Sequence, residues 1–240
     1  MAIKAILFDL YGTLINIETH EHRDEIYRGI AHYLTYQGIY LHRWEVRDRY
    51  YQIMKQQKEI RAEKYPEIDV EAIWNTFLRE KGIEAASTRR KLSTFLAQIY
   101  RGISRKHFKL YPDVKKVLDE LRPAYRMALI SDAQPGYALP EIKAVGLNGY
   151  FDPTIISAHY GFRKPDRRLT NKALDHMKLM PAEVICVGND MYRDIYGASR
   201  LGIKTIFFDS NQGRKYHENV TPDYVAYRFV DVLRGVEALK

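Results

Sequence analysis

The chain of 240 residues contains a single cysteine, which excludes an internal disulfide framework and a zinc site built from cysteines. It has no apolar run long enough to span a bilayer, and its first residues lack the basic region, apolar core and small-residue cleavage site of a signal peptide. These absences predict a cytoplasmic protein with no membrane partner.

The formal net charge of +8 is not gathered into a block, because basic and acidic residues alternate along most of the chain. This excess of positive charge favours a small anionic ligand. No helix-turn-helix, zinc-finger or aromatic RNA-binding motif occurs, so a nucleic-acid partner is not expected. The hydrophobic content of 46% excludes a disordered chain, whereas the oligomeric state stays open.

Four amphipathic helices are predicted in succession between residues 16 and 105, with no strand among them. Gly38 and Gly82 punctuate these helices, as does Pro66 with Asp69 as an N-cap. Their apolar residues recur at helical spacing: Ile26, Ile30, Tyr33 and Leu34; Val46, Tyr50, Ile53 and Met54; Val70, Ile73, Trp74 and Phe77; Leu92, Phe95, Leu96 and Ile99. We interpret residues 16–105 as an inserted, all-helical cap domain.

Strands and helices alternate after residue 110. The pattern predicts helices over 112–121, 136–145, 166–180 and 191–201 and from about 230, and strands over 127–131, 154–157, 184–188, 205–208 and 224–226. Such alternation implies right-handed crossovers and a parallel sheet covered on both faces. The fold class is therefore α/β, a doubly wound, Rossmann-like parallel sheet formed by residues 1–15 and 106–240.

The first strand of this sheet ends in a carboxylate. The run from Ile3 to Phe8 is almost wholly apolar, which is typical of a strand buried on both faces, and Asp9 and a glycine turn follow it directly. Because open parallel sheets bind ligands beyond the carboxyl ends of their strands, the chemistry is expected around Asp9.

The run Asp9-Leu-Tyr-Gly-Thr13 resembles the first motif of the haloacid dehalogenase (HAD) superfamily, whose aspartate is a covalent nucleophile. Three later strand ends resemble the other motifs in family order. Ser131 matches the second motif, whose hydroxyl donates to a phosphoryl oxygen, and Lys164 with the Pro-Asp after it matches the third. The run from Gly188 to Asp194 resembles the fourth, metal-binding motif of HAD phosphatases.

The resemblance implies a role for each matching residue. Three carboxylates brought together would repel one another without a cation, and a hard, oxygen-liganded ion such as Mg²⁺ suits them. The implied catalytic residues are Asp9, Tyr11, Ser131 and Lys164; the implied substrate-binding residues are Gly12, Thr13, Ser131 and Asp132; and the implied Mg²⁺ ligands are Asp9, the carbonyl of Tyr11 and Asp190, supported by Asp194.

Two departures from the family pattern leave the reaction open. Most HAD phosphatases have a second aspartate, the general acid and base, where this chain has Tyr11, and a phenol with a pKa of about 10 is a poor base at neutral pH. L-2-haloacid dehalogenases have tyrosine at that position, since a departing halide needs no proton. The fourth motif carries Asn189 directly after its glycine, where many relatives place their first acid, which here follows at Asp190.

Three hypotheses follow. The first is Mg²⁺-dependent hydrolysis of a small phosphorylated metabolite, favoured by the acids of the fourth motif and by Asp132, which would repel a halide or a carboxylate. The second is a metal-independent 2-haloacid dehalogenase, in which Arg49 or Arg61 binds the substrate carboxylate. The third is a ligand-binding protein with weakened catalysis. The basic loop over 211–217 is interpreted as solvated.

Overall fold

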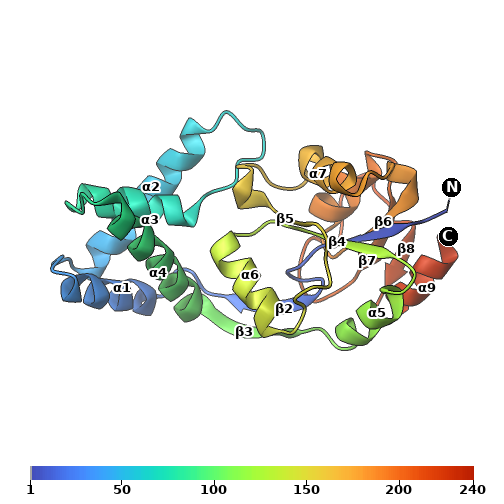
Figure 1. Ribbon diagram of the computed structural model, residues 1–240, viewed down its shortest axis with the longest axis horizontal. Helices are drawn as coiled ribbons and strands as arrows, with labels where there is room; N and C mark the ends of the chain where they lie inside the picture. The colour runs from blue at the N-terminus through green and yellow to red at the C-terminus, as the bar shows by residue number, and fades with distance from the viewer. Residues whose placement is uncertain (1) are drawn as a thin grey trace.

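The structure, a computed structural model, describes residues 2–240. At its centre lies a six-stranded parallel sheet in the order β5-β4-β1-β6-β7-β8 (Figure 1). The strands are β1 Ala5–Phe8, β4 Arg126–Ser131, β5 Thr154–Ile156, β6 Val184–Gly188, β7 Lys204–Phe208 and β8 Tyr224–Ala226. The predicted α/β fold class is confirmed.

Strand β1 lies in the middle of the sheet because its four residues are apolar and fully buried. It pairs in parallel with β4 on one side and β6 on the other, so that Phe8 lies opposite both Leu129 and Val187. Burial of each large apolar side chain contributes about 1.5–3 kcal/mol. This packing fixes the end of β1, and with it Asp9, between the ends of its two neighbours.

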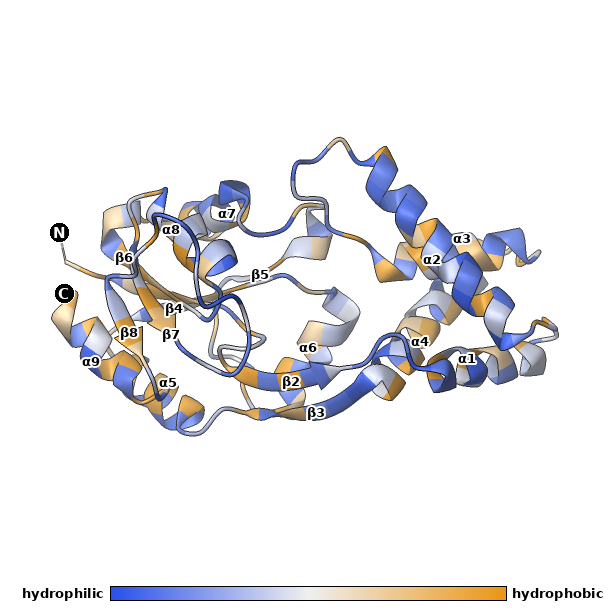
Figure 2. Ribbon diagram, turned by 180° about the vertical axis from the view of Figure 1, so that it is seen from behind, coloured by the Kyte–Doolittle hydropathy of each residue, from blue (hydrophilic) through white to orange (hydrophobic). Residues whose placement is uncertain are grey.

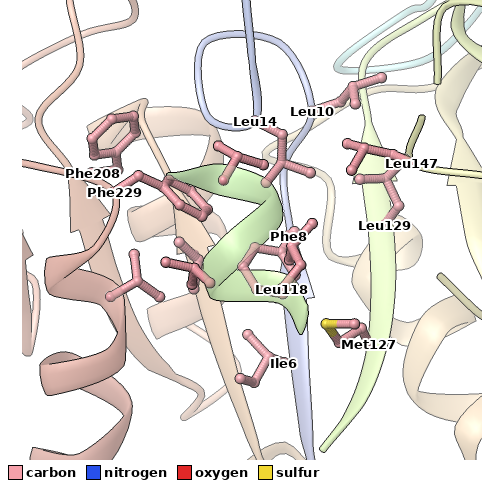
Figure 3. Packing of buried hydrophobic residues seen from close by; sticks show 14 of the residues in the cluster. Ile6, Phe8, Leu10, Leu14, Leu118, Met127, Leu129, Leu147, Phe208 and Phe229 are labelled. Carbon is pink, nitrogen blue, oxygen red and sulfur yellow. The ribbon is translucent and has the colours of Figure 1, made fainter. Parts of the chain in front are cut away.

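Helices cover both faces of the sheet. Ile6 and Phe8 face the helices α5 (Val114–Leu121), α6 (Pro135–Ala144) and α9 (Asp231–Ala238). Figure 3 shows Ile6 and Phe8 packed with Leu118 of α5 and near Phe229. Ala5 and Leu7 pack on the other face against α7 (Arg167–Met177) and the short α8 (Gly197–Ser199). The alternation of side chains along one strand thus supplies two separate core layers.

Four further helices form a unit with a core of its own (Figures 1 and 2). They are α1 Asp24–Tyr36, α2 Arg43–Ile60, α3 Val70–Glu80 and α4 Ala86–Ser104. Tyr50 lies at the centre of this core, with its ring centroid 4.8 Å from that of Trp74 and 5.0 Å from that of Tyr100. Tyr50, Trp74 and Tyr100 are therefore packing residues.

A two-stranded ribbon joins the helical unit to the sheet, where no strand was expected. Strands β2 (Ile15–Thr19) and β3 (Arg105–Leu110) pair in antiparallel fashion, with Ile17 opposite Phe108. Ile15, Ile17, Phe108 and Leu110 alternate with polar residues, but each alternating stretch is too short to outweigh the helical pattern beside it. The helical unit therefore begins and ends on one ribbon.

A second connection lies between α2 and α3. The amide of Arg163 donates to the carbonyl of Tyr65 at 3.0 Å, and that of Glu67 donates to the carbonyl of Gly161 at 3.0 Å. The buried carboxylate of Glu67 also accepts the hydroxyl of Ser157 at 2.7 Å. The helical unit is thus attached to the sheet domain on two sides.

The prediction of an α-helix over 191–201 is wrong for the first half of this range. Residues Met191–Tyr196 form a π-helix, and only Gly197–Ser199 are α-helical. Hydrogen-bond pattern rather than residue spacing separates the two types, so apolar periodicity does not distinguish them. Among residues 2–240, no helix has the length and apolar character required to cross a membrane.

Candidate active site

Asp9 lies directly after β1, with 8% of its surface exposed. Its backbone amide donates to the carbonyl of Val187 at 3.0 Å, which continues the pairing with β6 beyond the strand end. The Lys164 ammonium donates to Oδ1 of Asp9 at 2.6 Å, and the Thr13 hydroxyl donates to Oδ2 at 2.8 Å. A buried carboxylate with these two donors is held in one orientation.

Lys164 links the third motif to the first and the fourth. Its ammonium donates to Asp9 Oδ1 at 2.6 Å, to Asp194 Oδ1 at 2.6 Å and to the carbonyl of Ile130 at 3.1 Å. Although burial disfavours the charged form, the carboxylates of Asp194 and Asp9 hold the pKa of Lys164 above its ordinary value. All three protons of the ammonium are engaged, so Lys164 remains a fixed cation between two acids.

Asp194 supports this arrangement through both of its carboxylate oxygens. While Oδ1 accepts from Lys164, Oδ2 accepts the backbone amides of Asn189 at 3.1 Å and Asp190 at 3.0 Å. Only glycine fits at position 188, because a Cβ there would lie 2.3 Å from the Cβ of Asp194. The Asp194 carboxylate therefore shapes the turn after β6 and orients Lys164.

Asp190, predicted to face a metal ion, is turned into the loop. Its Oδ1 accepts the amides of Tyr192 at 3.0 Å and Arg193 at 2.8 Å, which makes it the N-cap of the π-helix. Its Oδ2 accepts from Nε of Arg193 and from the amide of Arg214, each at 3.1 Å. In spite of burial, hydrogen bonds and the charge of Arg193 hold the pKa of Asp190 below its ordinary value.

Asn189 occupies the position beside the Asp9 loop instead. Its Oδ1 accepts the Thr13 hydroxyl at 3.1 Å, the same hydroxyl that donates to Asp9. Its side chain lies against Gly12, where a Cβ would come within 2.3 Å of Nδ2, and Gly12 has a φ of +90°. The predicted role of Gly12 in the site thus has a physical basis in this close approach.

Three buried polar atoms of the predicted motifs have no hydrogen-bond partner among residues 2–240: Oγ of Ser131, Oδ2 of Asp132 and Nδ2 of Asn189. Leaving such a group unsatisfied costs about 1–3 kcal/mol. Ser131 ends β4, the neighbour of β1, and Asp132 follows it. Lys164 donates its backbone amide to Asp132 Oδ1 at 2.9 Å. The site therefore has hydrogen-bonding capacity that a polar ligand can satisfy.

The Tyr11 side chain has a partner that the sequence analysis missed. Its hydroxyl donates to Oε2 of Glu141, on α6, at 2.5 Å. Glu141 also accepts from Arg101 of α4 and Arg105 of β3. The available signal was an acid on the apolar face of a helix, because Tyr137, Ala138 and Ile142 are its buried companions on α6.

Arg49 and Arg61, the two arginines considered as carboxylate ligands, have other partners. Arg49 binds the carboxylate of Glu80, and Arg61 donates to the carbonyl of Glu67. The basic loop over 211–217 has exposed side chains but lies at the site. The amide of Arg214 donates to Asp190, and a Cβ on Gly213 would come within 2.5 Å of the carbonyl of Asn189.

Curated relatives match part of the chain. A glyceraldehyde 3-phosphate phosphatase of Pyrococcus abyssi is 36% identical over 98 residues, which cover 40% of this chain and 41% of that protein. A phosphoserine phosphatase of Thermus thermophilus is 28% identical over 149 residues, covering 60% and 59% of the two chains. The chain thus spans about two fifths to three fifths of the length of these relatives.

Solved structures match nearly the whole chain. A 2-haloacid dehalogenase from Pseudomonas syringae superimposes with a TM-score of 0.71, and a HAD phosphatase from Thermococcus onnurineus with a TM-score of 0.61. Each is 20% identical and covers 98% of both chains, so the likeness concerns the fold. The family model described as haloacid dehalogenase-like hydrolase matches residues 6–208. This chain belongs to the haloacid dehalogenase-like hydrolase family.

Proposed function

We propose that the protein hydrolyses a small phosphorylated metabolite in a Mg²⁺-dependent reaction, with Asp9 as the nucleophile. One observation carries the proposal: the Asp9 carboxylate is fixed by Lys164 and Thr13 beside the unsatisfied polar atoms of Ser131 and Asn189. A phosphoryl group has several oxygens that accept hydrogen bonds, and it matches such a set of donors. The phosphatase relatives support this choice over other hydrolase reactions.

In the first step, a carboxylate oxygen of Asp9 attacks phosphorus. The bond from phosphorus to the ester oxygen breaks, and an alcohol leaves after taking a proton from solvent. Water then attacks phosphorus of the aspartyl-phosphate, which returns the carboxylate and releases phosphate. Ser131 and Thr13 are the proposed hydrogen-bond donors to the phosphoryl oxygens, and Lys164 offsets their charge.

Proteins usually hold Mg²⁺ with one or two carboxylates, while water and substrate phosphate complete its shell. We propose Asp9, the Tyr11 carbonyl and Oδ1 of Asn189 as its ligands. Asn189 replaces the expected Asp190, because both oxygens of Asp190 already accept two N–H groups each. Asp194 supports the site through Lys164. When bound, Mg²⁺ would offset negative charge on the transferred phosphoryl group.

The helical unit over residues 16–105 is proposed to act as the cap, and residues 1–15 and 106–240 as the catalytic core. A cap that closes on the core excludes water and selects the substrate. The ribbon β2–β3 begins two residues after Thr13, which places the connection to the cap next to the site. A small anionic substrate and a cytoplasmic location stay part of the proposal.

The second candidate is a 2-haloacid dehalogenase. The observation that favours it is the pair of Tyr11 and Asn189, since the phosphatase pattern has an acid at each of these positions. Here Asp9 would displace halide from carbon and form an alkyl ester, which water then cleaves. The halide leaves without a proton, and the water that cleaves the ester supplies the proton taken up by the leaving 2-hydroxy acid.

Assays on two substrates separate these functions. We would follow phosphate release from p-nitrophenyl phosphate and halide release from 2-chloropropionate, each with Mg²⁺ or EDTA, for the wild type and Asp9→Asn. The proposal expects Mg²⁺-dependent phosphate release that Asp9→Asn reduces on the order of 10³-fold or more. Halide release that persists in EDTA would establish the dehalogenase instead. Turnover of neither substrate, with tight binding of inorganic phosphate, would indicate a ligand-binding protein.

A further inference from the structure

Glu141 is a buried carboxylate at the junction of the helical unit and the core. Its side chain is 4% exposed and accepts Nε and Nη2 of Arg101 at 2.8 and 2.9 Å. It also accepts Nη1 of Arg105 at 3.1 Å and the hydroxyl of Tyr11 at 2.5 Å. Figure 1 shows α6, which carries Glu141, between the sheet and α1–α4. One carboxylate thus contacts the loop after Asp9, the last turn of α4 and the start of β3.

These contacts determine the hydrogen-bonding role of the Tyr11 hydroxyl. The side chain of Glu141 is buried, and the hydroxyl of Tyr11 donates to Oε2 of Glu141 at 2.5 Å. Its one proton is donated to Glu141, which leaves the oxygen able only to accept a further hydrogen bond. Tyr11 therefore has no proton to give to a leaving group, and this arrangement does not make it a general acid.

The helical unit also contacts the ring of Tyr11. The Arg101 guanidinium lies 5.2 Å from the ring centroid of Tyr11 and 5.1 Å from that of Tyr137 on α6. Arg101 is therefore a cation between two aromatic rings and is bidentate on Glu141. A displacement of α4 relative to the core would break these contacts together, and Tyr11 is two residues from the nucleophile.

We propose that Glu141 is a positioning residue, which fixes Tyr11 and makes its orientation depend on the docking of α4 through Arg101. The loop from Asp9 to Thr13 is then ordered for catalysis only when the helical unit is docked. The proposal rests on Asp9 being the nucleophile, as in the proposed function. An ordinary structural ion pair would stabilise the fold without acting through Tyr11.

A double-mutant cycle on Glu141→Gln and Tyr11→Phe distinguishes these two roles. With whichever of the two substrates the wild type turns over, we expect each variant to lower kcat about tenfold with little change in KM. We expect the double variant to be no slower than either single variant, because both remove the same contact. Glu120→Gln, an exposed acid on α5, is the matched control and should match the wild type. Effects that multiply in the double variant would overturn the proposal.

A readout that needs no turnover keeps the test independent of the proposed function. The amides of Gly12 and Leu14 donate to carbonyls within the loop at 2.8 Å, and that of Ile15 does so at 2.9 Å. Hydrogen exchange of these amides should be faster in Glu141→Gln and in Arg101→Lys, which keeps its charge but loses the bidentate contact. Unchanged exchange in both variants would overturn the proposal, whereas an inactive wild type with faster exchange would overturn only the proposed function.

Discussion

Two buried charge clusters flank the loop after β1, and they are built with opposite sign. On one side Lys164 lies between Asp9 and Asp194; on the other Glu141 lies between Arg101 and Arg105. The first cluster has a net charge of −1 and the second a net charge of +1. Their centres differ in origin, since Lys164 reaches the end of β1 within the core whereas Glu141 joins the core to the helical unit. The difference separates the proposed reaction centre from an ion cluster that links two parts of the fold.

The two clusters also differ in burial, which determines how much free energy of unfolding is lost when each is broken. The side chains of Lys164, Asp9 and Asp194 are 8%, 10% and 3% exposed. In the other cluster Arg105 is 32% exposed, so it can turn its guanidinium into water. Removing the central residue leaves two like charges without their ionic partner in both cases, but in the Lys164 cluster neither remaining side chain is more than 10% exposed.

The largest expected effect follows from this comparison. Lys164→Met should lower the free energy of unfolding by about 3–5 kcal/mol, because two buried carboxylates lose their cation. Glu141→Ala should cost less, since Arg105 can hydrate. Urea unfolding of both variants at pH 7 measures the difference, with Lys178→Met, at an exposed lysine after α7, as the control. An equal or greater loss in Glu141→Ala would contradict the assignment of the Lys164 cluster as the more deeply buried one.

How far the sequence predicts these clusters depends on how each is built. Parallel strands bring their carboxyl ends to one edge, which indicates a site at Asp9, and the resemblance to the family's later motifs adds Ser131, Lys164 and Asp194 to it. The Glu141 cluster depends on how α6 and α4 pack, and no local pattern fixes that packing. The order of Asn189 and Asp190 was also undecided, because a one-residue difference in a turn determines which side chain faces inward.

Asn189→Asp is expected to have an intermediate effect. A carboxylate beside Asp9 adds a charged oxygen ligand, so the Mg²⁺ concentration for half-maximal effect should fall roughly tenfold. The shift in thermal unfolding midpoint with added Mg²⁺ measures this without turnover. Asp190→Asn is the matched control, since that side chain caps the π-helix, and its Mg²⁺ response should equal that of the wild type. A weaker Mg²⁺ response in Asp190→Asn than in the wild type, with no gain in Asn189→Asp, would return the ligand role to position 190.

Glu67 lies at the second connection between the helical unit and the sheet domain. Unlike the acids of the two clusters, it is buried with no cation bonded to it among residues 2–240. Burial, and the charge of Asp132, raise the pKa of Glu67 above its ordinary value. A carboxyl with a raised folded pKa binds more protons in the folded state, so its ionisation costs stability as pH rises from the unfolded pKa of about 4.3 through the folded pKa.

Glu67→Gln should therefore have the smallest effect, and one of opposite sign. It removes the buried charge, so the midpoint of thermal unfolding at pH 7 should rise by roughly 2–4 °C, and the gain should vanish as pH falls below the unfolded pKa. Scanning calorimetry between pH 4 and 8 measures it, with Glu63→Gln, on the exposed Arg168 pair in the same segment, as control. A gain that is the same at every pH would show that the amide improves the contact with Ser157, and that the charge of Glu67 costs the fold nothing.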